Sequence, residues 1–137
     1  MVTERLCAPT VWRKRLEPET RPAWSDVTSA GTFTSEAGGR FDRHYHDCDE
    51  YWLIFEGRAL VEIDDERFLV EPGDIVCTEI GREHDILQVF ERLRGFWFEC
   101  ATVRGGVAGH RHRGLESDAW HPVLGPDDPG PKSRSAR

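Results

Sequence analysis

Short apolar runs recur through the middle of the chain, and turn-forming residues separate them. The runs are rich in β-branched and aromatic side chains and occupy residues 32–34, 51–55, 59–63, 67–70, 74–77, 86–90 and 95–100. Gly, Pro and Asp residues interrupt the pattern at 38–39, 56–57, 64–65, 72–73 and 81. Runs of this composition are typical of strands, and no amphipathic helical period extends beyond about two turns. The pattern therefore predicts an all-β fold, either a sandwich or a small barrel.

The two ends of the chain differ from this central region. In residues 1–28 the prolines Pro9, Pro18 and Pro22 interrupt the sequence, which predicts an arm with short edge strands. Residues 29–104 form the predicted core, and residues 105–121 a C-terminal extension. Residues 122–137 are rich in Pro and Gly and have almost nothing apolar to bury, so we predict a disordered tail. A chain of 137 residues is expected to form one domain.

Charge and composition exclude several classes of protein. The formal net charge of −7 argues against a nucleic-acid partner, which would require a basic surface. No apolar run of about 18 residues predicts a membrane span, and the first residues lack the layout of a secretory signal. We therefore expect a cytoplasmic protein. The four cysteines contain no Cys-x-x-Cys pair, so they are expected to be reduced thiols and not a zinc knuckle.

Metal-binding residue types gather around residues 38–50. His44 and His46 are two positions apart, so on a strand both imidazoles point to the same face of the sheet. Glu50 begins the next apolar run, and His84 stands just before a later one. Three imidazoles and one carboxylate suit first-row divalent ions from Mn(II) to Zn(II). With one carboxylate on a dipositive ion, the site carries about +1 and favours an anionic substrate.

A His-x-His pair is weak evidence by itself, because surface histidine pairs are common. The pair at His44 and His46 is accompanied by Glu50, by His84 and by an all-β pattern, and these together favour a metal site. A second pair, His110 and His112, has no carboxylate at the matching spacing. We expect that second pair to lie in an exposed basic segment outside the core.

The spacing of these residues resembles the two sequence motifs of the cupins. The first motif is matched at every position, by Gly38, His44, His46, Glu50 and Gly57. The second is matched by Gly73, Glu79, Gly81, His84 and Gln88, with Glu79 where Pro is usual and Gln88 where Asn is usual. The resemblance covers about residues 28–104. It implies a double-stranded β-helix, or jelly-roll barrel, in which His44, His46, Glu50 and His84 hold one metal ion.

Strand alternation predicts which side chains line the pocket of such a barrel. If Glu50 and His84 point inward, Trp52, Ile54, Ile86 and Gln88 do so too, and Tyr51, Leu53 and Phe55 point outward. Trp52, Gln88 and Arg40 are the candidate substrate-binding residues. Gln88 and Glu99 are the candidate catalytic residues, although the parity of the strand that carries Glu99 stays open.

The resemblance to cupins implies a metal-dependent enzyme that acts on a small polar or anionic molecule. We favour a non-haem oxygenase or dioxygenase with Fe(II); Mn, Ni, Co, Cu and Zn are alternatives. A redox-neutral isomerase, lyase or decarboxylase stays open, as does a non-catalytic cupin that binds a sugar or another small molecule. The polar N-terminal arm and the outward Tyr51, Leu53 and Phe55 predict a homodimer.

Overall fold

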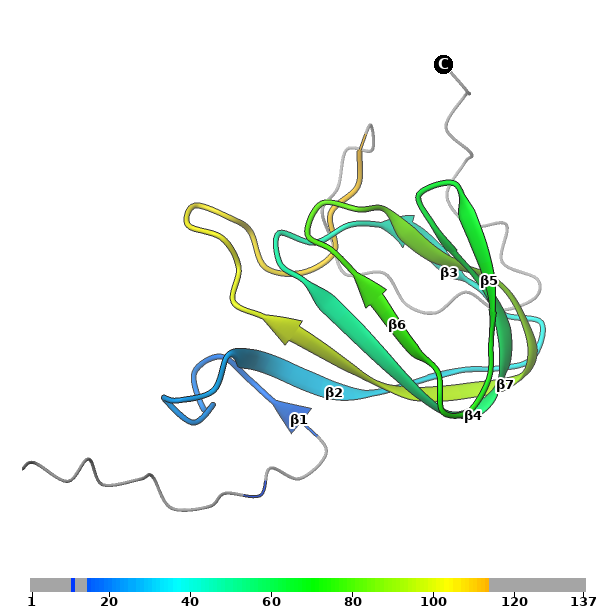
Figure 1. Cartoon of the computed structure of the whole chain (residues 1–137), viewed down its shortest axis with the longest axis horizontal. Helices are drawn as coiled ribbons and strands as arrows, with labels where there is room; N and C mark the ends of the chain where they lie inside the picture. The colour runs from blue at the N-terminus through cyan, green and yellow to red at the C-terminus, as the bar shows by residue number, and fades with distance from the viewer. Residues whose placement is uncertain (1–10, 12–14, 114–137) are drawn as a thin grey trace, which may run out of the picture.

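The computed structural model describes residue 11 and residues 15–113, and within these residues it contains strands and turns but no helix. Seven antiparallel strands form one sheet that curls around the core (Figure 1). They are β1 (Arg15–Leu16), β2 (Val27–Ser35), β3 (Phe41–His44), β4 (Glu50–Ile63), β5 (Glu66–Val70), β6 (Ile75–Thr78) and β7 (His84–Cys100). The predicted all-β fold is confirmed, and its form is the jelly-roll barrel.

Two long strands organise the sheet. β7 pairs with β2, β3 and β4, and β4 pairs in addition with β5 and β6. His84 at the start of β7 lies opposite His44 at the end of β3, whereas Glu50 at the start of β4 lies opposite Glu99 near the end of β7. Because the sheet curls, the predicted metal-binding residues nevertheless meet, with ligand atoms within 4.8 Å of one another.

Gly57 lies inside β4, where the sequence pattern predicted a break between two strands. Its φ of 88° is accessible to glycine, and the register against β7 shifts between Glu56 and Arg58. The bulge bends the strand without ending it and changes which side chains point inward, from Ile54 before it to Ala59 after it. The predicted separation of runs 51–55 and 59–63 is thus wrong, and runs 86–90 and 95–100 likewise belong to one strand, β7.

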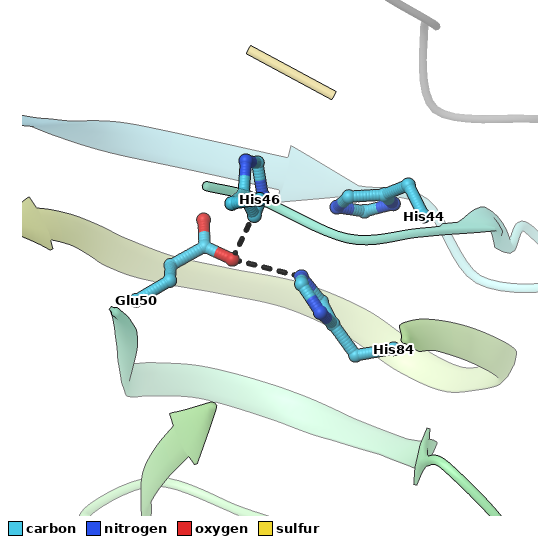
Figure 2. A group of neighbouring side chains, drawn as sticks. All are labelled: His44, His46, Glu50 and His84. Atoms are coloured by element: carbon cyan, nitrogen blue, oxygen red, sulfur yellow. Dashed lines mark ion pairs between the residues drawn. The ribbon is translucent and has the colours of Figure 1, made fainter. Parts of the chain in front are cut away.

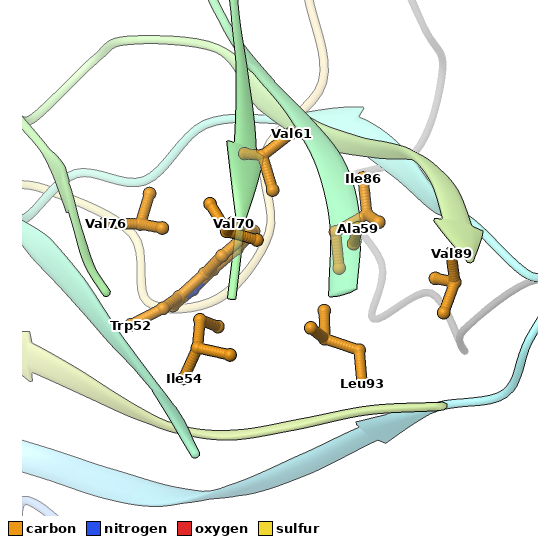
Figure 3. Close-up of a cluster of buried hydrophobic side chains, with 9 residues drawn as sticks. All are labelled: Trp52, Ile54, Ala59, Val61, Val70, Val76, Ile86, Val89 and Leu93. Carbon is orange, nitrogen blue, oxygen red and sulfur yellow. The ribbon is translucent and has the colours of Figure 1, made fainter. Parts of the chain in front are cut away.

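The core fills the interior of the curled sheet (Figure 3). As predicted, Trp52 and Ile54 are buried while Tyr51, Leu53 and Phe55 are exposed on the opposite face of β4. The buried cluster consists of Trp52, Ile54, Ala59, Val61, Val70, Val76, Ile86, Val89 and Leu93. Burial of these apolar side chains supplies the main driving force for folding.

The N-terminal arm contributes one edge strand in its described part. Arg15 and Leu16 form β1, which pairs with Gly31 and Ala30 of β2 in the same chain. Residues 1–10 and 12–14, residues 114–121 of the predicted extension and the predicted tail at 122–137 lie outside the described residues. Within the described part of the chain, no helix has the length and apolar character that crossing a membrane requires.

The homodimer stays a prediction, and the outer face of β4 offers the surface that tests it. Leu53 is 37% exposed, Tyr51 and Phe55 are each 39% exposed, and Phe55 lies beside Phe96 with ring centroids 5.5 Å apart. We expect the protein to sediment as a dimer at micromolar concentration and Leu53→Glu to shift it to monomer. The control is Leu69→Glu on β5, where the side chain is already 63% exposed. A monomeric unsubstituted protein would contradict the prediction.

Candidate metal centre

Four side chains predicted as metal ligands converge at one end of the barrel (Figure 2). His44 ends β3, Glu50 begins β4 and His84 begins β7, while His46 follows β3 in the connecting loop. One ligand atom from each residue lies within 4.8 Å of all the others, and all four residues are buried. The structure therefore brings together side chains that the sequence separates by up to 40 positions.

Backbone pairing and loop contacts hold the four residues in place. His44 lies opposite His84 in the β3–β7 register. In the neighbouring loops, the Gly81 amide donates to the His46 carbonyl oxygen at 3.0 Å. The Ile80 amide donates to Oδ1 of Asp49 at 2.8 Å, which ties the loop before β4 to the loop before β7. Gly81 has a φ of 80°, a conformation that glycine adopts without strain.

Each of the three histidines directs one ring nitrogen at a backbone carbonyl. Nδ1 lies 2.7 Å from the carbonyl oxygen of Asp42 for His44, 3.1 Å from that of Gly109 for His46, and 3.2 Å from that of Arg82 for His84. Because a carbonyl oxygen only accepts, each Nδ1 carries the proton. A ring whose only proton is on Nδ1 presents the bare lone pair of Nε2, which is the form that ligates metals.

Three inward atoms of the cluster have no hydrogen-bond partners. Glu50 Oε2 lies 3.2 Å from His46 Nε2 and 2.8 Å from His84 Nε2. All three atoms are buried, and none has a hydrogen-bond partner. With the Nδ1 positions protonated, lone pairs face lone pairs at these distances, and burial makes that arrangement unfavourable. A single divalent ion would satisfy all three atoms, so the cluster is compatible with one metal ion.

The pKa values of the cluster reflect the same need for positive charge. Burial alone would raise the pKa of Glu50, but its contacts with His46 and His84 outweigh burial and hold it well below the usual range. Burial alone would lower the pKa of His46, yet Glu50 and Glu99 together raise it. Burial and the neighbouring histidines place the pKa of His44 well below its ordinary value. Glu50 is therefore ionised and His44 neutral, as metal ligation requires.

Two other predicted residues lie beside the cluster. The Trp52 ring meets the His84 ring edge to face, with centroids 5.4 Å apart. Glu99 points to the inner side of β7, where its Oε1 lies 3.7 Å from His46 Nδ1 and its Oε2 accepts a hydrogen bond from Ser29 at 3.2 Å. Burial raises the pKa of Glu99. The structure thus decides the parity that the sequence left open and places a second carboxylate next to the site.

The predicted inward orientation of Gln88 is wrong. His84 and Ile86 are buried as expected, but Gln88 is exposed. The β4–β7 register shifts between Leu60, which pairs with Gln88, and Val61, which pairs with Ile86. This irregularity moves Gln88 to the outer face. Arg40 is half-buried directly before β3, and its substrate contact stays a prediction.

The second histidine pair is not the exposed segment that the sequence predicted. His112 is only 5% exposed, and the His110 ring lies 4.1 Å from the His44 ring at an interplanar angle of 27°. Burial and the proximity of His46 lower the pKa of His110 to about 3. The repeated His-x-His was the only sequence feature that could have indicated a place beside the cluster, because the contacts that bring His110 and His112 there are all long-range.

Cys48 lies in the loop between His46 and Glu50 and is expected to be unreactive. It is 4% exposed, and burial together with the Glu99 and Glu50 carboxylates raises the pKa of its thiol to about 12. Cys77 is exposed. At pH 8 we expect Cys77→Ser to remove one equivalent of fast thiol labelling and Cys48→Ser to remove none. Loss of a fast equivalent in Cys48→Ser would show that the thiol is accessible.

Fold and site together define a single jelly-roll barrel with a buried ligand set for one metal ion. The family model described as "Cupin domain" matches residues 31–97. The chain therefore contains a cupin domain over these residues.

Individual proteins also resemble this chain. The chain is 38% identical over 92 residues to the uncharacterized protein y4oW of Sinorhizobium fredii, a match that covers 67% of this chain and 39% of the relative. The chain therefore spans well under half the length of that relative. The structure resembles the DMSP lyase DddQ of Ruegeria pomeroyi, with a TM-score of 0.53, 21% identity, and coverage of 58% of this chain and 41% of the lyase.

A third similar structure is a salicylate 1,2-dioxygenase of Pseudaminobacter salicylatoxidans. Its TM-score is 0.50 at 18% identity, over 53% of this chain and 20% of the dioxygenase. At such low identity, the likeness to both solved structures shows the fold alone.

Proposed function

We propose that this protein is a mononuclear metal-dependent enzyme that acts on a small polar or anionic molecule. The observation that carries the proposal is the convergence of His46 Nε2, His84 Nε2 and Glu50 Oε2 without hydrogen-bond partners in a buried site. A structural cluster of this kind would satisfy these atoms internally, because buried unpaired polar atoms are unfavourable. Their arrangement is that of a ligand set prepared for a cation.

The chain's own residues have distinct tasks in this proposal. His44, His46, Glu50 and His84 would hold the metal, with the tautomers set by the carbonyl oxygens of Asp42, Gly109 and Arg82. Trp52 packs edge to face against His84 on the core side and would hold that ligand in place. A bound metal ion would supply either redox chemistry with dioxygen or Lewis-acid polarisation of a substrate oxygen.

Two reaction types are compatible with this site. We favour an oxygenase with Fe(II), because three neutral imidazoles and a single carboxylate leave positions for substrate and oxygen on a metal that prefers six ligands. A redox-neutral lyase, isomerase or decarboxylase is the second candidate, and one observation favours it. The Glu99 carboxylate stands beside the cluster with a raised pKa, as a group that transfers a proton during catalysis would. The similar structures include one dioxygenase and one lyase.

Reconstitution with single metals tests the proposal. Metal-depleted protein is loaded separately with Fe(II), Mn(II), Co(II), Ni(II) and Zn(II) and mixed with a panel of small acids, thiols and phenols. We expect oxygen uptake by the Fe(II) form, absent in His46→Ala. Iron-loaded protein that consumes no oxygen with any compound would contradict the oxygenase. Product formation without oxygen, lost in Glu99→Gln, would support the redox-neutral reaction. Ligand binding without turnover would support a non-catalytic cupin.

A further inference from the structure

The segment 107–113, which we name the C-terminal strap, crosses the end of the barrel that holds the metal-binding cluster. Tyr45, between His44 and His46, forms an antiparallel bridge with Arg111 of the strap, with two backbone hydrogen bonds of 2.9 Å. The Arg111 guanidinium donates to Asp47 Oδ2 at 2.7 Å, and the Val107 amide donates to the same oxygen at 2.8 Å. The strap is thus attached to the loop that carries the ligands.

The strap orients His46 directly. The carbonyl oxygen of Gly109 accepts the hydrogen bond from His46 Nδ1 at 3.1 Å. His44 and His84 obtain the equivalent hydrogen bond from residues two positions away in their own sequence. The tautomer and ring orientation of His46 therefore depend on a residue 63 positions further along the chain.

The strap orients His44 through two further contacts. The His110 ring stacks on the His44 ring, with centroids 4.1 Å apart. His112 Nε2 lies 2.9 Å from Asp42 Oδ2, and both side chains are fully buried. The backbone carbonyl oxygen of that same Asp42 holds His44 Nδ1 at 2.7 Å. His112 thereby secures the residue whose carbonyl selects the tautomer of His44.

We propose that Gly109, His110 and His112 are positioning residues of the metal centre, so that metal binding and the ordering of the strap are energetically coupled. The inference rests on the proposed metal binding by the cluster. It assigns to the second His-x-His a role outside the ligand set: His110 and His112 hold His44, and Gly109 holds His46, in the orientation that the metal requires. Because coupling is reciprocal, strap contacts raise metal affinity and the metal stabilises the strap.

Co(II) binding to full-length variants tests the coupling. We expect His112→Phe, which keeps a buried ring and loses the contact with Asp42, to raise the Co(II) dissociation constant about 10-fold and to change the visible d–d spectrum. His112→Gln, whose amide can still donate to Asp42, should restore most of the affinity. His110→Ala should weaken binding, and His110→Phe, which keeps the stacked ring, should weaken it less.

Two controls separate positioning from general loss of stability. Val70→Ala removes buried apolar volume on β5, so it should lower the melting temperature without changing Co(II) affinity or the spectrum. Hydrogen exchange in the unsubstituted protein gives a test that does not depend on the folding of any variant. Co(II) should slow exchange of the amides of residues 107–113.

The outcomes distinguish this inference from the proposed function. If the unsubstituted protein binds one Co(II), but the strap variants match Val70→Ala in affinity and spectrum, the coupling is overturned and the metal centre stands. Unchanged exchange of the strap on Co(II) binding would overturn the coupling equally. An unsubstituted protein that binds no metal would overturn both.

Discussion

Glu50→Gln should lower the affinity for Co(II) by about 100-fold or more, beyond the roughly 10- to 100-fold typical of losing a group that only orients a ligand. The substitution preserves side-chain volume but replaces the buried carboxylate, the one charged member of the cluster, by a neutral amide. The amide is a weaker ligand for a dipositive ion. Competition with a chromophoric chelator measures the dissociation constant.

The matched control is Glu99→Gln, which removes a neighbouring carboxylate 3.7 Å from His46. Glu99 is outside the ligand set, so its substitution should lower affinity by about 10-fold at most. Equal effects of the two variants would show that only the overall charge matters, and unchanged affinity in Glu50→Gln would contradict the metal centre.

Loss of metal affinity in Glu50→Gln should also remove the stabilisation of the folded protein by the metal. A ligand that binds only the folded protein stabilises it by about 2.7 kcal/mol at a concentration of 100 times its dissociation constant. Saturating Co(II) should therefore raise the melting temperature of the unsubstituted protein by several degrees, and a chelator should reverse the increase. Glu50→Gln should show little change with either addition.

Gly57→Ala should destabilise the barrel by more than about 3 kcal/mol, a large part of the roughly 5–15 kcal/mol that stabilises an ordinary domain. A Cβ at this position would lie 2.0 Å from the Arg92 carbonyl oxygen, which is backbone of the adjacent strand β7. That oxygen cannot move aside without breaking the pairing of the two longest strands. The residue also has a φ of 88°, which adds about 1–2 kcal/mol of strain for alanine. Urea denaturation followed by circular dichroism measures the loss.

Comparison with Gly73→Ala separates the steric clash at Gly57 from the backbone strain. Gly73 has a comparable φ of 99°, but a Cβ built there meets nothing within 4 Å. Its substitution should cost about 1–2 kcal/mol from backbone strain alone. If the two variants lose similar stability, the close approach of β4 and β7 at Gly57 has no energetic effect, and backbone strain alone accounts for both losses.

Residue spacing along a strand was enough to predict that His44 and His46 share a face and which face of β4 enters the core, and the resemblance to the cupin motifs completed the predicted ligand set with Glu50 and His84. His44 and His46 share a face because side chains alternate with a period of two, and the same rule places Trp52 and Ile54 inside. The motifs around Gly38, Gly57 and Gly81 indicated how the separate runs fold together. These features are local or follow a repeated spacing, so they can be predicted without knowing which residues they contact in the folded chain.

Predictions from strand alternation were wrong where the pairing of the two long strands, β4 and β7, is irregular. Gln88 was predicted to point inward with His84, but the register against β4 shifts just before it and turns it to solvent. The interruption at Gly57 was predicted to end a strand, yet pairing with β7 continues past it. Whether a glycine ends or bends a strand depends on the backbone of its neighbour, which the sequence of one strand does not contain.

By itself, the sequence determined an all-β pattern in which His44 and His46 share a face, because alternation along a strand is a property of consecutive residues, and its resemblance to the cupin motifs added Glu50 and His84 as predicted ligands of one metal ion. Only the tertiary structure decided that Glu99 faces the cluster, that Gly109 contacts His46, and that His110 and His112 return to the side of His44. Those positions depend on contacts across about 50 to 70 residues, whose pairing is decided by packing and backbone register and leaves no periodic trace in the chain.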